Sequence, residues 1–190
     1  MSSVMELGLG LGLAGAAGIR TYLPLIIIGL LTRFSQIFEY RAPFKIFASV
    51  PVLLLFLVLA GYELLIERAN EQKTQEALLL SAVRALGGAI LLAGLFGGFG
   101  TLIGFALGGL TALAVHLVKL RLKTHFTRPN YGYQMLYGLE DLAAIAGVLL
   151  AILLPWSSYI ILVGIIIIYL KKAKQNNNRY RSDYKAKSWR

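Results

Sequence analysis

Six apolar segments, each near the length of a membrane-spanning helix, follow one another along this 190-residue chain. About 20 mostly apolar residues are needed for one helix to cross the hydrocarbon core of a bilayer. The segments cover residues 4–31, 49–66, 77–95, 101–120, 135–154 and 159–170. Only 15% of the residues are charged and 57% are hydrophobic, whereas a soluble domain has about 25% charged residues. The sequence therefore predicts an all-α membrane protein with one transmembrane domain over residues 1–170.

Several kinds of chemistry lack the residues they require. The chain has no cysteine, which excludes disulfides, thiolate metal sites and thiol catalysis. Its two histidines, His116 and His125, have no metal-ligand spacing, and the glycine-rich run 8–12 lacks the Lys-Ser/Thr of a nucleotide loop. We expect no metal, no cofactor and no enzyme activity. A lipid-acting membrane enzyme that uses Glu140 and Asp141 is the weakest alternative.

Basic residues are concentrated at the C-terminus and in one loop. The net charge is +10, and residues 171–190 hold eight Lys and Arg. A basic segment directly after an apolar helix follows the positive-inside rule and suits anionic lipid headgroups better than nucleic acid. We expect a disordered cytoplasmic tail and, with six spans, a cytoplasmic N-terminus. The loop 33–48 also holds basic residues, but six alternating spans place it on the side of the membrane opposite the cytoplasm. There it would lie as an amphipathic segment along the membrane–water interface.

Two of the segments carry matching rows of small residues that end in a basic side chain. Residues four apart share one helix face, and small residues there let another backbone approach closely. The two rows are Gly8, Gly12, Ala16 and Arg20, and Gly104, Gly108, Ala112 and His116. The constant offset favours two inverted three-helix repeats, 4–95 and 97–170, as in many transporters. Chance similarity of glycine-rich helices is the alternative, and small-residue rows also suit a homo-oligomer.

Ionisable residues lie within the predicted spans, where an isolated charge costs at least about 2.5–3.5 kcal/mol. We expect Arg20 to pair with Glu63, and His116 to pair with Glu140 or Asp141. Arg84 and Glu6 are expected to lie near helix ends and to reach the headgroups. Such pairs either line a polar pathway or fix the helix register.

The stretch GIRTYLP, residues 18–24, indicates a weak point in the first segment. Gly18 lowers helix propensity just before Arg20, and Pro24 removes the hydrogen bond to the Arg20 carbonyl. Irregular backbone at this depth is tolerated only against protein or a water-filled cavity. A break that presents Arg20 to an anion is one interpretation, and an ordinary proline kink is the other.

Four motifs together resemble a bacterial integral membrane family known as a domain of unknown function, DUF4126. They are GLAGAAGIRTYLPLIIIGLLTR, YELLIER, GGLTALAVHLVKLRLK and GLEDLAAIAG, in this order. The positions that match are Gly18, Arg20, Pro24, Glu63, His116, Lys119, Glu140 and Asp141. This chain has Arg68 and no proline where that family often has a Lys and a Pro after the glutamate. The resemblance implies a membrane protein and transfers no activity.

The function expected from the sequence is a small transporter or channel in the bacterial inner membrane. Its polar centre would consist of Arg20, Glu63, His116, Glu140 and Asp141, with Arg20 holding an anionic group and Glu63, Glu140 and His116 carrying protons. The alternative is a scaffold or assembly factor that transports nothing, in which the buried charges are structural.

Overall fold

The computed structural model describes residues 3–35, 40–68, 74–126, 132–164 and 166–167, and all regular structure within them is helical. The basic tail, on which the lipid-headgroup prediction rests, lies outside the described residues. Seven elements follow in chain order: α1 (Ser3–Ile19), α2 (Tyr22–Phe34), the 3₁₀ helix η1 (Phe44–Ala48), α3 (Val50–Arg68), α4 (Thr74–Ala93), α5 (Gly100–Phe126) and α6 (Gly132–Leu153). Residues 155–164 form a further helix. The all-α prediction is confirmed.

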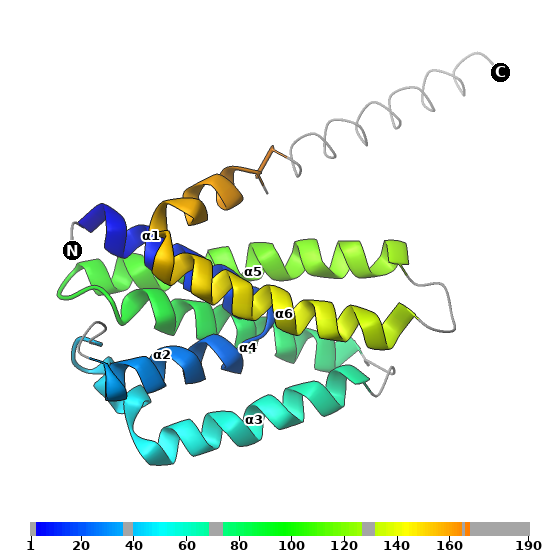
Figure 1. The fold of residues 1–190 in the computed structure, drawn as a ribbon, viewed down its shortest axis with the longest axis horizontal. Helices are drawn as coiled ribbons and strands as arrows, with labels where there is room; N and C mark the ends of the chain where they lie inside the picture. Colours follow the sequence, from blue (N-terminus) through cyan, green and yellow to red (C-terminus); the bar gives the residue numbers. More distant parts are fainter. Residues whose placement is uncertain (1–2, 36–39, 69–73, 127–131, 165, 168–190) are drawn as a thin grey trace.

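Helices α3 to α6 coincide with four of the predicted segments, and their axes run in roughly the same direction in Figure 1, with α4 packed against α5. At about 1.5 Å per residue, the 20 residues of α4 extend about 30 Å, which equals the hydrocarbon thickness of a bilayer. Among the described residues, one stretch, Gly100–Arg121 in α5, is by itself long and apolar enough to cross a membrane. Four other apolar helices are shorter: Val4–Ile19, Tyr22–Phe34, Val50–Ile66 and Leu78–Ala93.

The first apolar segment is two helices, and the expected continuous span over residues 4–31 is wrong. Helix α1 ends inside the bundle, and α2 runs back towards the end where α1 began (Figure 1). A guanidinium nitrogen of Arg41, which follows α2, lies 4.0 Å from a carboxylate oxygen of Glu6 near the start of α1. Residues 3–34 therefore form a helical hairpin, which we call the hairpin below. We call the end of the bundle that holds Glu6 and Arg41 the N-terminal end, and the opposite end the far end.

Helix α1 lies at the centre of the bundle, where it packs against α4, α5 and α6. Small residues permit this close packing. A Cβ atom on Gly18 would lie 2.4 Å from the carbonyl oxygen of Ala112 in α5, and one on Gly8 would lie 2.6 Å from that of Pro155. Helices α4 and α5 approach in the same way at Gly88 and Gly108. Helix α3 lies at the edge and packs against α2 and η1.

Replacing a glycine by alanine is expected to have opposite effects on stability at the α4–α5 contact and on the open face of α3. A Cβ on Gly108 would lie 2.3 Å from the carbonyl oxygen of Gly88, whereas one on Gly61 in α3 meets nothing within 4 Å. Gly108→Ala is therefore expected to destabilise the fold by about 1–3 kcal/mol. Gly61→Ala is expected to stabilise it by about 0.5–1 kcal/mol through helix propensity. Thermal unfolding of the detergent-solubilised variants measures both, and shifts of the same sign would contradict this packing.

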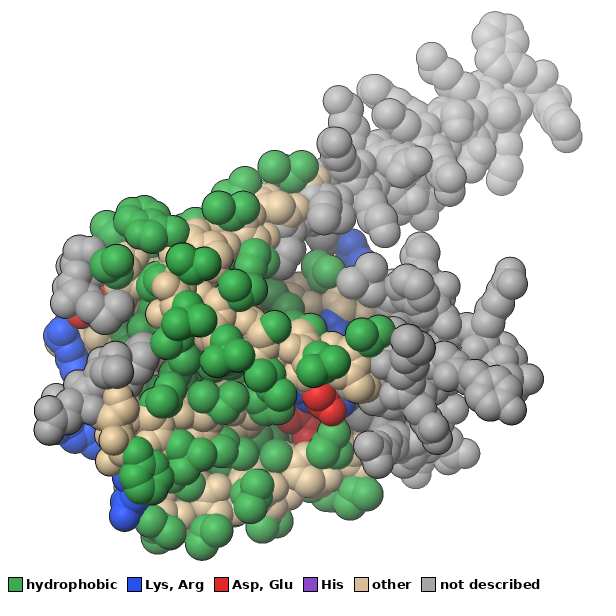
Figure 2. All heavy atoms as spheres, viewed as in Figure 1, with side chains coloured by type: hydrophobic (Ala, Val, Ile, Leu, Met, Phe, Trp, Pro, Cys, Tyr) green, Lys and Arg blue, Asp and Glu red, His purple; other side chains and the backbone are tan. Residues whose placement is uncertain are grey.

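The bundle has an apolar core that includes Leu9, Leu13 and Leu91, but its surface is also unusually apolar and several charged side chains are buried. Arg20, Glu63, Arg84 and Lys119 are buried, while many leucines of the long helices are more than half exposed. Examples are Leu57 and Leu65 in α3, Leu102 and Leu110 in α5, and Leu142 and Leu153 in α6. Figure 2 shows the apolar surface, a face covered mostly by hydrophobic side chains, with a small group of acidic and basic side chains among them and further basic side chains along its left edge.

Candidate functional site

The break in the hairpin forms the centre of the site. The last backbone hydrogen bond of α1 runs from the N–H of Arg20 to the carbonyl of Ala16 at 3.0 Å. Pro24 has no N–H, so it offers no hydrogen bond to the Arg20 carbonyl. The helix ends at Ile19 and resumes at Tyr22, which places Arg20 and Thr21 in the turn between two helix ends.

A charged side chain from another helix caps each side of the break. The Lys119 ammonium donates to the carbonyl of Ile19, at the C-terminal end of α1, at 2.9 Å. The Thr21 N–H, at the N-terminal end of α2, donates to both carboxylate oxygens of Glu63 at 3.3 Å. Both charges have the sign that the helix dipole favours at their position. Side chains of this chain therefore occupy the two helix ends where many transporters bind ions or substrate.

The first ion-pair group joins the break to α5 and α6. Nε of Arg20 lies 2.6 Å from an oxygen of Asp141, and Nη2 of Arg20 lies 3.8 Å from an oxygen of Glu140. The same Glu140 oxygen lies 2.8 Å from the Lys119 ammonium. Arg20 is 3% exposed, whereas Asp141 is 35% exposed. This group, which we call the outer group, therefore leads from the molecular surface to the break.

The second group, the inner group, lies deeper and joins α3, α4 and α5. Arg84 in α4 is 0% exposed, and its guanidinium lies 3.2 Å from an oxygen of Glu63. The other terminal nitrogen of Arg84 contacts Nδ1 of His116. An arginine can only donate, so Nδ1 accepts and the imidazole is neutral. The Thr21 hydroxyl donates to Glu63 at 3.3 Å, which links the inner group to the break.

The ion pairs add partners that the sequence did not predict. Arg20 lies beside Asp141 and Glu140, and His116 contacts Arg84. The reversal at the break places the backbone N–H and the hydroxyl of Thr21 beside Glu63. The site does bring together Arg20, Glu63, His116, Glu140 and Asp141, but as two groups on either side of residues 20–21.

The predicted position of Arg84 near a helix end is wrong, because it lies in the middle of α4. The sequence did indicate that Arg84 faces the interior. Gly88 lies four residues later on the same helix face, and it packs against α5. The sequence did not predict that Lys119 caps the C-terminal end of α1. Lys119 lies at the end of the apolar segment 101–120, a position typical of a basic residue that faces the adjoining loop. Glu6, by contrast, lies at the N-terminal end beside Arg41.

The two groups balance in charge. Three cations, Arg20, Arg84 and Lys119, face three carboxylates, Glu63, Glu140 and Asp141, around the neutral His116. A charge in a low-dielectric interior is tolerated when it is paired and hydrogen-bonded. Within the described part of the chain, no three His, Asp or Glu side chains cluster as metal ligands would.

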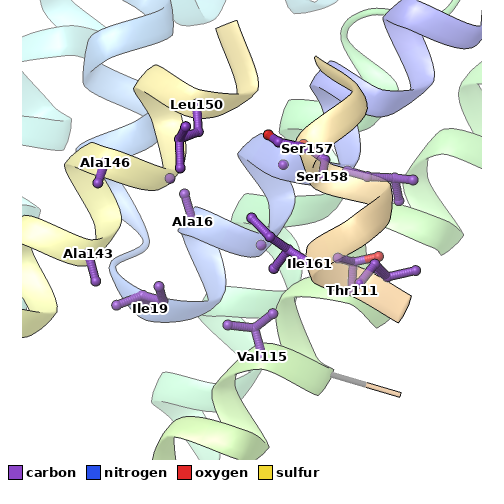
Figure 3. A pocket seen from close by; sticks show the side chains of 15 residues that line it. Ala16, Ile19, Thr111, Val115, Ala143, Ala146, Leu150, Ser157, Ser158 and Ile161 are labelled. Carbon is purple, nitrogen blue, oxygen red and sulfur yellow. The ribbon is translucent and has the colours of Figure 1, made fainter. Parts of the chain in front are cut away.

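An apolar cavity of about 270 Å³ lies beside the outer group, between α1, α5, α6 and the helix 155–164. Figure 3 shows Ala143 and Ile19 on one side of the cavity and Ser157, Ser158 and Thr111 on the other, with Ala16 between them. Ile19 provides the carbonyl that Lys119 binds, and Ala143 follows Asp141 by two residues. One end of the cavity therefore adjoins the charges of the outer group.

Comparison with known proteins gives one match. No curated protein and no solved structure is similar to this chain at a significant level. The model of a protein family described as a domain of unknown function, DUF4126, matches residues 7–174, which include the break, both ion-pair groups and the cavity. This match covers most of the chain, so the chain belongs to the DUF4126 family.

Proposed function

We propose that this chain is an integral membrane protein of the bacterial inner membrane. The apolar surface supports this, because leucine-covered helices of about bilayer length suit lipid, and Arg20, Glu63, Arg84 and Lys119 are buried. The positive-inside rule then places the far end in the cytoplasm, since Lys119 and Arg121 lie towards that end of α5. In this orientation the N-terminus faces away from the cytoplasm, which changes the topology expected from six alternating spans.

The proposed activity is transport of a small anion together with a proton. The observation that carries it is the broken helix whose two ends meet a charge-balanced ion-pair network. Discontinuous helices near mid-depth are a recurrent way to build transport sites, because their ends hold partial charges inside the membrane. The inverted repeats 4–95 and 97–170 also belong to this proposal, although α5, the counterpart of the hairpin, is continuous.

The outer group explains why the cargo would be an anion. Arg20 cannot lose its proton, and the Lys119 ammonium is held by Glu140 and by the Ile19 carbonyl. Only the carboxylates can change charge, so proton binding takes the group from neutral to positive and never to negative. A proton on Asp141 weakens its pair with Arg20, and the guanidinium then accepts an anion in its place. Anion and proton would leave together, and the original pair would re-form.

Uptake into proteoliposomes tests the proposal. The probes are ethanesulfonate, a phosphonate and a phosphate monoester, because they stay charged and do not leak through a bilayer as neutral acids. With one proton per monovalent anion, an inward gradient of one pH unit is expected to give about tenfold accumulation. The membrane potential should have no effect on this ratio. If no probe accumulates above protein-free liposomes, the transport proposal fails.

Asp141→Asn separates proton coupling from anion binding. The amide mimics the protonated carboxyl, so the variant should bind an anion without a proton. We expect accumulation driven by the pH gradient to fall from about tenfold to about onefold, while uptake becomes sensitive to the membrane potential. Glu6→Gln is the matched control, because Glu6 lies at the N-terminal end, away from the outer group. Unchanged coupling in Asp141→Asn would remove Asp141 from the proton pathway.

The inner group favours a second candidate function, a membrane scaffold. Glu63, Arg84 and His116 are all almost completely buried and are paired with one another. Charges sealed in this way suit a structural role, in which they fix the register of α3, α4 and α5. A scaffold predicts no uptake of any probe and normal folding of Asp141→Asn.

A further inference from the structure

We propose that the cargo is an amphiphilic anion with a single short hydrocarbon chain, whose headgroup binds at Arg20 and whose chain occupies the 270 Å³ cavity. This inference deepens the proposed transport function and rests on it. It adds the substrate class, which the ion pairs alone do not define.

The wall of the cavity is mostly apolar, and two of its three hydroxyl groups, those of Thr111 and Ser157, bind backbone carbonyls. The Thr111 hydroxyl donates to the carbonyl of Leu107 at 2.8 Å, and the Ser157 hydroxyl donates to that of Leu154 at 2.7 Å. Both hydroxyl protons are therefore directed at the backbone of their own helices. The remaining surface is mainly Leu, Ile, Val, Ala and Gly side chains, which suit a hydrocarbon chain.

Two glycines keep the cavity open without being required by packing. A Cβ on Gly15 would meet only a Val115 methyl group at 3.8 Å, and one on Gly147 would meet Ala16 Cβ at 3.5 Å, both ordinary contact distances. By contrast, Gly12 and Gly18 allow no Cβ, because the nearest atoms would lie at 2.3 and 2.4 Å. Larger side chains at 15 and 147 would begin to fill the cavity, so glycine there preserves space.

The position and size of the cavity define the occupant. Two of its lining residues lie beside the outer group: Ile19, whose carbonyl accepts from the Lys119 ammonium, and Ala143, two residues after Asp141. A hydrocarbon chain in the cavity would therefore bring its headgroup close to the outer group. That group can be neutral or positive, which selects an anionic head. Pockets for drug-sized ligands are about 300–1,000 Å³. A volume of 270 Å³ therefore fits one short chain and not a two-chain phospholipid.

A series of alkylsulfonates from ethane- to octanesulfonate tests this, with the full-length protein in nanodiscs. Each methylene that enters the cavity should strengthen binding about fourfold until the cavity is full. Gly147→Leu should abolish this gain, because its side chain occupies the same space. Gly61→Leu is the matched control in a glycine that faces open space, and it should behave as the wild type does. Both variants are measured in nanodiscs of the same lipid composition, so each probe partitions into the lipid equally in the two samples. The difference in binding between the variants therefore reports the cavity alone.

The outcomes separate the two proposals. One outcome is that ethanesulfonate accumulates with a proton, while the gain in binding per methylene is the same in Gly147→Leu and Gly61→Leu. This would overturn the amphiphile inference and leave the transport proposal standing. If binding strengthens with chain length in Gly61→Leu alone but no probe accumulates, the amphiphile site stands and transport fails. An equal gain with alkyltrimethylammonium ions would overturn the anionic headgroup. Binding of no probe would indicate that bilayer lipid already fills the cavity, which also overturns the inference.

Discussion

Arg84→Met is expected to destabilise the fold more than any other change considered, by about 3–5 kcal/mol. Arg84 is completely buried, and its removal leaves the Glu63 carboxylate in the interior without its cationic partner. His116 loses a donor at the same time. The yield of folded protein after detergent extraction and its thermal midpoint measure the effect. Arg33→Met, at an exposed arginine of α2, is the control and should change stability by less than about 0.5 kcal/mol.

A second variant separates the cost of an unpaired charge from the loss of packing. Glu63→Gln in the Arg84→Met background removes the carboxylate, while the amide oxygen still accepts from the Thr21 N–H. We expect the double variant to regain much of the stability lost by Arg84→Met alone. If the double variant is less stable than Arg84→Met, the inner group is not a balanced ion pair.

Arg20→Gln is expected to reduce anion uptake by roughly 10- to 100-fold, the value of one or two charge-assisted hydrogen bonds. Its cost in folding should be smaller than that of Arg84→Met. Glu140 keeps its contact with Lys119 at 2.8 Å, and Asp141 is exposed enough to be hydrated. Uptake per folded protein in proteoliposomes is the measurement.

Arg20→Lys is the control that preserves charge. A lysine places one compact ammonium where the guanidinium reaches both Asp141 and Glu140, so partial uptake is expected. A folded Arg20→Gln protein that accumulates anions as the wild type does would exclude Arg20 from the transport site.

The sequence predicts helices α3 to α6 well because each is a run of apolar residues near bilayer length. It also points to the break, since Gly18 and Pro24 disturb helix geometry locally. It does not reveal that the chain reverses there, because hydropathy reports burial and not direction. One signal for reversal was present: as one helix, the 28 residues of segment 4–31 would extend about 42 Å, well beyond the hydrocarbon core.

The ion pairs were harder to predict than the residues that form them. Depth in an apolar segment identifies Arg20, Glu63 and Glu140 as buried charges, because each is costly unless paired. The choice of partner depends on which helices are neighbours, and spacing along one helix does not contain that information. Reversal at residues 20–21 brings Thr21 to Glu63, and Arg20 to Asp141 and Glu140, and neither contact follows from a single straight helix over residues 4–31.

The hairpin has a consequence for biogenesis. In the proposed membrane orientation, the hairpin enters and leaves the bundle at the same end, so it would add an even number of passages and leave the orientation of every later helix unchanged. The helices that enclose α1, namely α4, α5 and α6, are all synthesised after it. The first segment to leave the ribosome is therefore the last to obtain its complete set of neighbours, which exists only after the residues of α6 have been synthesised.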